Sequence, residues 1–115
     1  MSVQIRAANG VTIAVLEGDL DGNTARDLER ELGAIPGDST QILLDMSRVG
    51  YVSSAGLRLL LLIYRLARSR GGEVCLIGLS AEIRDVMYST GFLQFFLLTE
   101  TEEEGLAMLQ RASVV

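Results

Sequence analysis

The chain has 115 residues, a net charge of -5 and one cysteine, and it contains no histidine and no lysine, so that all ten basic residues are arginine. A chain of this length buries enough surface for one core without disulfides or metal, so residues 1–115 are expected to form a single domain. Without imidazole, and with Cys75 alone, the common zinc ligand sets and His-based triads are excluded. The absence of lysine excludes a P-loop and Schiff-base chemistry. We therefore expect no catalytic residues, no metal site and no cofactor.

The acidic balance, with 15 Asp and Glu residues against 10 Arg, argues against a nucleic-acid partner, because such partners require basic patches. A protein partner is expected instead. Residues 1–15 lack the basic start and the long apolar middle of a signal peptide. The longest apolar run, 59–63, is far too short to cross a bilayer. These features predict a cytoplasmic protein without membrane insertion, a setting that suits a free thiol.

An opening β-hairpin is predicted from a period of two residues. Val3, Ile5 and Ala7 alternate with polar residues, and Val11, Ile13 and Val15 resume this spacing. Asn9-Gly10, between the two runs, is a strong tight-turn signal. The chain is therefore expected to begin with two antiparallel strands.

The rest of the chain alternates short apolar runs with segments of helical periodicity. Strands are expected over residues 41–46, 73–78 and 95–98. Helices are expected over residues 23–32, from Ser53 or Ser54 to residue 70, over 80–89 and over 101–112. Pro36-Gly37 and Gly71-Gly72 end the first and second helical patterns. Together these elements predict an α/β fold of order β-β-α-β-α-β-α-β-α, with a mixed, mostly parallel sheet flanked by helices.

Residues 43–62 form the most informative stretch, in which a buried strand leads through a short polar loop into a mainly buried helix. Ser53 or Ser54 stands at or beside the start of this helix. In the simplest interpretation, one serine hydroxyl accepts a hydrogen bond from a free N–H of the first turn, which stabilises a helix by about 1 kcal/mol. On position alone, capping is the expected role.

Several spaced motifs occur in a fixed order along the chain. They are GDLD followed by NTA over residues 18–25, DMS at 45–47, SSAGL at 53–57, GG at 71–72, residues 83–87 and TGF at 90–92. In this combination and order the sequence resembles the STAS domain, the fold of bacterial anti-sigma factor antagonists. The resemblance covers nearly the whole chain and implies a STAS-type fold that is a regulatory substrate and not an enzyme.

The resemblance implies that Ser54 is the serine that a cognate anti-sigma kinase phosphorylates, with Asp21 beside it. The unmodified form would bind an anti-sigma factor with serine kinase activity and so free a sigma factor. Phosphorylation would switch this binding off, and a PP2C-type phosphatase would reset it. The partner-binding residues implied are Asp21, Asn23, Thr24, Ser53, Ser54, Gly56, Leu57 and Arg58.

Two alternatives remain, one for the serine that accepts the phosphate and one for the function of the protein. The family usually carries Asp directly before the phosphorylated serine, whereas this chain has Ser53, which is itself an alternative acceptor. The chain could instead be a STAS scaffold, or a transporter-associated STAS subunit, that is never phosphorylated. A small enzyme or nucleotide-binding domain is disfavoured by the missing His and Lys and by the lack of a Gly-rich phosphate loop.

Other polar or small residues have simple structural interpretations. Asp19 and Asp21 could form an acid/base pair, but in a strand-to-helix turn they are expected to cap the helix and orient the loop. Asp45, at the end of a buried strand, could face a ligand, but it is expected to accept hydrogen bonds from the next loop. Gly56 marks either close approach of another backbone or a small residue that lets the first turn pack.

Cys75 lies within an apolar strand and is expected to be a buried small hydrophobe rather than a nucleophile. Phe92 suits an anchor in the core or a loop. Phe95 and Phe96 are consecutive in an expected strand, so their side chains should point to opposite faces. One of these two rings is therefore expected to be exposed and available to a partner.

Overall fold

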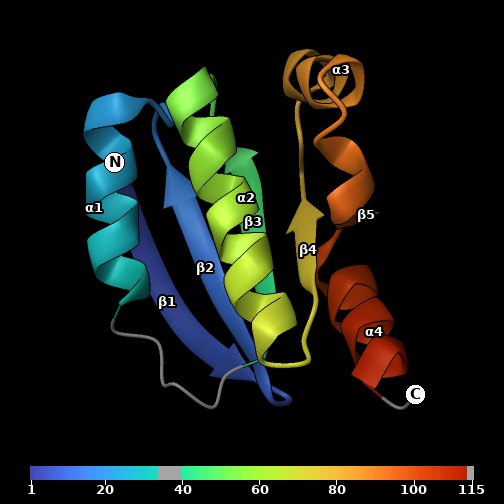
Figure 1. Ribbon diagram of the computed structural model, residues 1–115. Coiled ribbons are helices and arrows are strands. Elements are labelled where there is room, and N and C mark those ends of the chain that lie inside the picture. Colours follow the sequence, from blue (N-terminus) through green and yellow to red (C-terminus); the bar gives the residue numbers. More distant parts are fainter. Residues whose placement is uncertain (34–39, 114–115) are drawn as a thin grey trace.

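The chain folds as a five-stranded mixed sheet with helices on both of its faces (Figure 1). The computed structural model describes residues 1–33 and 40–113, so the predicted helix stop at Pro36-Gly37 lies outside the described residues. The strands are β1 (Ser2–Ala8), β2 (Val11–Glu17), β3 (Gln41–Arg48), β4 (Val74–Ile77) and β5 (Leu97–Thr99). The helices are α1 (Gly22–Leu32), α2 (Ser54–Ser69), α3 (Ala81–Ser89) and α4 (Glu102–Ser113), with a 3₁₀ turn, η1 (Leu93–Phe95).

The strands lie in sequence order across the sheet, β1-β2-β3-β4-β5. β1 pairs with β2 in antiparallel fashion, and the three later pairings are all parallel. The hairpin turn has positive φ at Asn9 (54°) and Gly10 (77°), as a two-residue turn between twisted strands requires. The predicted order of elements and the predicted mixed sheet are confirmed.

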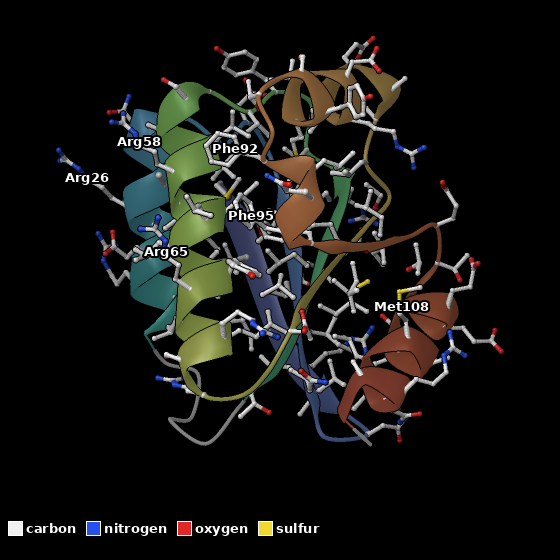
Figure 2. The ribbon with its side chains drawn as sticks, turned by 45° about the vertical axis from the view of Figure 1, so that its right-hand side comes forward. Arg26, Arg58, Arg65, Phe92, Phe95 and Met108 are labelled. Atoms are coloured by element: carbon white, nitrogen blue, oxygen red, sulfur yellow. The ribbon has the colours of Figure 1, made fainter. Side chains whose placement is uncertain are left out.

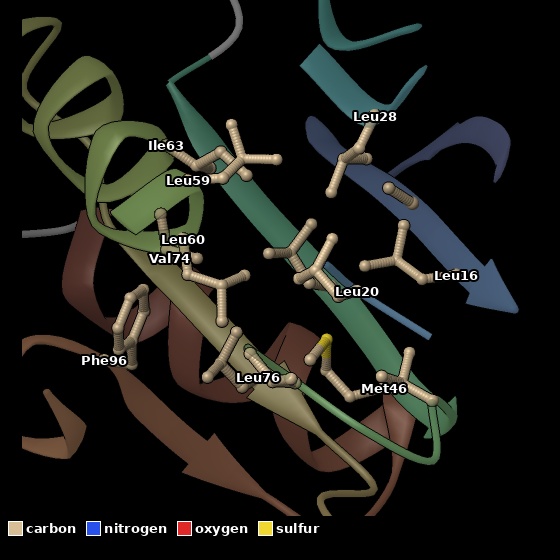
Figure 3. Packing of buried hydrophobic residues seen from close by; sticks show 14 of the residues in the cluster. Leu16, Leu20, Leu28, Met46, Leu59, Leu60, Ile63, Val74, Leu76 and Phe96 are labelled. Carbon is tan, nitrogen blue, oxygen red and sulfur yellow. The ribbon is translucent and has the colours of Figure 1, made fainter. Parts of the chain in front are cut away.

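The larger core lies between the sheet and the pair α1 and α2 (Figure 3). Leu60 and Ile63 of α2 are buried there with Leu16 of β2 and Leu76 of β4, because these positions recur every three or four residues on the helix and every second residue on the strands. A smaller core on the opposite face joins Ile13, Leu43, Cys75 and Leu109 beneath α4. Alternation along β2 and β3 therefore supplies both cores. None of the helices in the described part of the chain is long and apolar enough to cross a membrane.

The region of Phe95 and Phe96 differs from the prediction. The predicted strand 95–98 is replaced by η1 and the shorter β5, because Phe95 and Phe96 donate backbone hydrogen bonds three residues back, to Phe92 and Leu93 (both 3.3 Å). Both rings lie against Tyr64, at centroid distances of 5.2 Å and 5.8 Å. Phe96 is buried and Phe95 is half-buried, so the expectation of one exposed ring was wrong.

Candidate functional site

Two loops lie side by side at the carboxyl ends of β2 and β3. One leads from β2 into α1 and contains Leu20, and the other leads from β3 into α2 and contains Val52. These two residues form a parallel β-bridge. Leu20 donates its N–H to the Tyr51 carbonyl (2.8 Å), and Ser53 donates its N–H to the Leu20 carbonyl (2.9 Å). The backbone itself therefore holds the Asp21 turn next to the start of α2.

Gly56 allows this close approach. A Cβ added at Gly56 would lie 2.5 Å from the Leu20 carbonyl oxygen and 2.9 Å from Leu20 Cγ. Such contacts are shorter than side-chain carbon atoms tolerate, so only glycine fits here without a shift of α2. The interpretation of Gly56 as a point of close backbone approach is confirmed.

Asp21 caps α1. Its carboxylate accepts hydrogen bonds from the N–H groups of Asn23 and Thr24, both at 3.0 Å, while its own N–H donates to Thr24 Oγ1 (2.9 Å) in a reciprocal capping box. The N–H of Thr24, and then that of Asn23, hold the pKa of the Asp21 carboxyl below its usual value. The predicted capping role is confirmed for Asp21, and the side chain is ionised at neutral pH.

The two serines at the start of α2 have different surroundings. Ser53 is the N-cap, and its Oγ accepts a hydrogen bond from the Gly56 N–H (3.2 Å). Ser54 is the first helical residue and is exposed, and within the described residues its hydroxyl makes no hydrogen bond. The capping hydroxyl is therefore that of Ser53, and the free hydroxyl is that of Ser54.

The other residues predicted to contact a partner divide into two groups. Asn23 and Arg58 are exposed and Thr24 is half-buried, so their side chains border the same surface as Ser54. Gly56 and Leu57 are buried, Leu57 with only 5% of its surface exposed, because this side of α2 faces the core. Both residues help to position the helix, and their contact with a partner stays a prediction.

Sequence reasoning missed an apolar patch beside this surface. Tyr51 is 55% exposed, directly before the bridged Val52, and Val86 of α3 is also exposed. Both line a small cavity of about 80 Å³ between this loop and α3. The available signal was an aromatic residue in a loop whose other residues, at 49–53, are Val, Gly and Ser.

Two further predictions concern residues away from Ser54. Asp45 accepts hydrogen bonds from the Ser47 N–H (3.0 Å) and the Ser47 hydroxyl (2.6 Å), so it accepts a backbone N–H as predicted, but from the end of its own strand and not from the next loop. Cys75 is fully buried, and burial raises the pKa of its thiol, which confirms the interpretation as a core residue. Among the described residues, no group of three or more His, Cys, Asp or Glu side chains could hold a metal ion.

The charged residues of the helix that begins at Ser54 are all basic, although the protein is acidic overall. α2 carries Arg58, Arg65 and Arg68 and no acidic residue. Figure 2 shows Arg26 of α1 extending from the same side of the molecule as Arg58 and Arg65. Acidic side chains occur on α1, at Asp27, Glu29 and Glu31, and in the first turn of α4 on the other face of the sheet. The arrangement therefore presents a free hydroxyl beside an ionised carboxylate, with the cation of Arg58 one helical turn away.

Comparison with known proteins is consistent with this arrangement. The STAS domain family model matches residues 2–105. A candidate anti-sigma factor antagonist, BtrV of Bordetella bronchiseptica, is 34% identical over 113 residues, which are 97% of each chain. An anti-sigma factor antagonist of Mycobacterium paratuberculosis superposes with a TM-score of 0.84 at 24% identity, covering 95% of this chain and 93% of that one.

The Bacillus cell fate determinant SpoIIAA, solved in its phosphorylated form, superposes with a TM-score of 0.72 at 22% identity, covering 93% of this chain and 98% of that one. Anti-sigma factor antagonists are regulatory proteins and not enzymes. The matched residues include the Asp21 turn, the Ser53-Ser54 loop and α2. This protein belongs to the STAS domain family.

Proposed function

We propose that this chain is an anti-sigma factor antagonist whose unmodified form binds an anti-sigma factor with serine kinase activity and so releases a sigma factor. Phosphorylation of Ser54 by that kinase ends the binding, and a PP2C-type phosphatase restores it. The observation that carries the proposal is the exposed Ser54 hydroxyl, free of hydrogen bonds within the described residues and adjacent to the Asp21 turn. The similarity to anti-sigma factor antagonists supports the choice of partner.

The contact surface consists of the exposed and half-buried side chains around this hydroxyl. Asp21, Asn23 and Thr24 contribute the first turn of α1, and Ser53, Ser54 and Arg58 contribute the start of α2. Backbone pairing between the two loops fixes their relative position before any partner binds. The surface is therefore preformed, which favours a switch in which added charge, and not a change of conformation, ends the binding.

Phosphorylation changes the charge at this surface by nearly -2. The N-terminal end of α2 accommodates that charge, because its free N–H groups favour anions, so the domain stays folded. An acidic group of the partner about 6 Å away is repelled by about 1–3 kcal/mol in a half-wetted interface. That repulsion weakens binding roughly tenfold to a hundredfold.

The direct test is phosphorylation in vitro, followed by mapping with mass spectrometry. With the cognate anti-sigma kinase and ATP, the wild type and the Ser53→Ala variant should each gain one phosphate at Ser54, and Ser54→Ala should gain none. Ser53→Ala is the matched control, since it removes the neighbouring hydroxyl. A wild-type chain that stays unmodified beside an active kinase would contradict the proposal, and a phosphate on Ser53 would move the switch to the capping serine.

Binding of Ser54→Asp separates a switch from a constitutive scaffold. In the switch, the added carboxylate weakens binding of the anti-sigma factor about tenfold, by the repulsion described above. In a scaffold or a transporter-associated subunit, the affinity is unchanged. Isothermal titration calorimetry with the wild type, Ser54→Ala and Ser54→Asp decides between them.

A further inference from the structure

Arg58 lies four residues after Ser54, which is one turn further along α2 on the same side of the helix. Both side chains are exposed. Within the described residues, the Arg58 guanidinium takes part in no ion pair and no hydrogen bond. Helical side chains at this spacing are neighbours on the surface, so opposite charges placed on them attract each other.

No competing carboxylate occupies Arg58 from its own helix, since α2 contains no acidic residue. Asp21, on the turn packed against the start of α2, directs its carboxylate to the N–H groups of Asn23 and Thr24. On α1, Asp27 pairs with Arg30 (3.8 Å), and Arg26 adds a second cation on the same side as Arg58. A negative group on Ser54 would therefore find a free cation one turn away.

We propose that Arg58 is the internal counter-ion of phosphorylated Ser54 and that this pairing withdraws from the surface a cation that the unmodified chain offers to an acidic group of its partner. The inference rests on the proposed phosphorylation of Ser54 and deepens it. Phosphorylation then acts twice at one place, because it adds negative charge and also neutralises a positive contact. The partner surface that this arrangement fits is acidic.

The pairing is tested by ³¹P NMR titration of the full chain carrying phosphoserine at position 54, introduced during translation so that no kinase is needed. The second pKa of phosphoserine lies near about 6. An ion pair at this helical spacing should lower it, so the pKa in Arg58→Gln should be higher than in the wild type by about 0.4 unit. Arg58→Lys, which keeps the charge, should restore most of the difference.

Arg65→Gln is the matched control, because Arg65 lies on the same exposed stripe two turns further along α2 and is beyond reach of the phosphate. Its titration should equal that of the wild type. Arg26→Gln tests the cation of α1. If Arg58→Gln titrates like the wild type, or if only Arg26→Gln raises the pKa, the pairing is overturned.

A binding measurement tests the withdrawal of the cation. With the anti-sigma kinase as partner, the loss of affinity on phosphorylation should be about twofold smaller in Arg58→Gln than in the wild type, because that variant has no cation to withdraw. If phosphorylation lowers the affinity equally in both chains while the phosphoserine pKa still differs between them as expected, Arg58 pairs with the phosphate but is not a contact that phosphorylation removes from the partner. Because the titration uses neither kinase nor partner, its failure is distinguishable from failure of the proposed function.

Discussion

Three polar side chains at the site serve two different purposes. Asp21 and Ser53 satisfy the free N–H groups at the starts of α1 and α2, so their oxygens are occupied by the fold. Ser54, one residue after the second cap, has no such task within the described residues. The two serines are adjacent, but the Ser53 hydroxyl is held by the helix start, whereas the Ser54 hydroxyl is free to react.

The Asp21 cap should make stability depend on pH. Its hydrogen bonds lower the pKa of the folded-state carboxyl below the ordinary value of 3.8, so the carboxylate stabilises the fold above that pH and this stabilisation is lost as the pH falls below it. Asp21→Asn keeps a capping side chain but removes the titration. Between pH 5 and pH 3 the urea midpoint of the wild type should therefore fall further than that of Asp21→Asn. Equal falls in the two proteins would contradict this assignment.

At the scale of elements, the position of α2 depends on one glycine. The helix begins where Gly56 meets the Leu20 carbonyl, and the bridge between Leu20 and Val52 fixes the loop that precedes it. A bulkier residue at this point would push the start of α2 away from the Asp21 turn. The geometry of the proposed contact surface is therefore coupled to packing beneath it.

Gly56→Ala should lower the free energy of unfolding by about 1–3 kcal/mol, because the added Cβ would lie 2.5 Å from a backbone oxygen. Gly22→Ala is the matched control in the first turn of α1, since its added Cβ would meet only Ala55 Cβ at 3.9 Å. This control should change stability by less than about 0.5 kcal/mol. Urea unfolding measures both, and equal stabilities for the two variants would show that α2 is not held by this contact.

Patterns along the chain predicted the order of elements because period-two and helical apolar spacing are local signals. They failed at Phe95, where packing of two rings on Tyr64 selects a 3₁₀ turn, since this contact joins residues far apart in sequence. At the site, the motifs located Ser53 and Ser54. The burial of Leu57 depends on the residue at which α2 begins, because that residue decides which side chains face the core, and the exposure of Tyr51 depends on how the Leu20 and Val52 loops pair. Neither property can be read from spacing.

At the scale of the whole molecule, one sheet separates two cores of unequal size. Cys75 of β4 lies in the smaller core with Ile13, Leu43 and Leu109, and none of its surface is exposed. Among residues 1–33 and 40–113, the hydrogen-bonding neighbours of its Sγ atom are the Leu76 carbonyl and the Thr99 hydroxyl, at 3.8 Å and 3.7 Å. A reagent can therefore reach the thiol only when α4 separates from the sheet.

Labelling of Cys75 by a thiol reagent should be governed by unfolding. Burial raises the pKa of the thiol and shields it, so at pH 8 the folded protein should react far more slowly than the protein in urea. The destabilised Gly56→Ala variant should be labelled faster than the wild type, and Gly22→Ala should match the wild type. Fast labelling of the native wild type would show that α4 opens independently of the rest of the fold.

The backbone pairing between the Leu20 and Val52 loops also bears on how quickly partners can be exchanged. Loops that are already ordered lose little conformational entropy when a partner binds, so encounter does not wait for a loop to fold. Under the function proposed above, release after phosphorylation would likewise require no refolding of the site. Each cycle of exchange would then be limited by diffusion and by the enzymes that add and remove the phosphate.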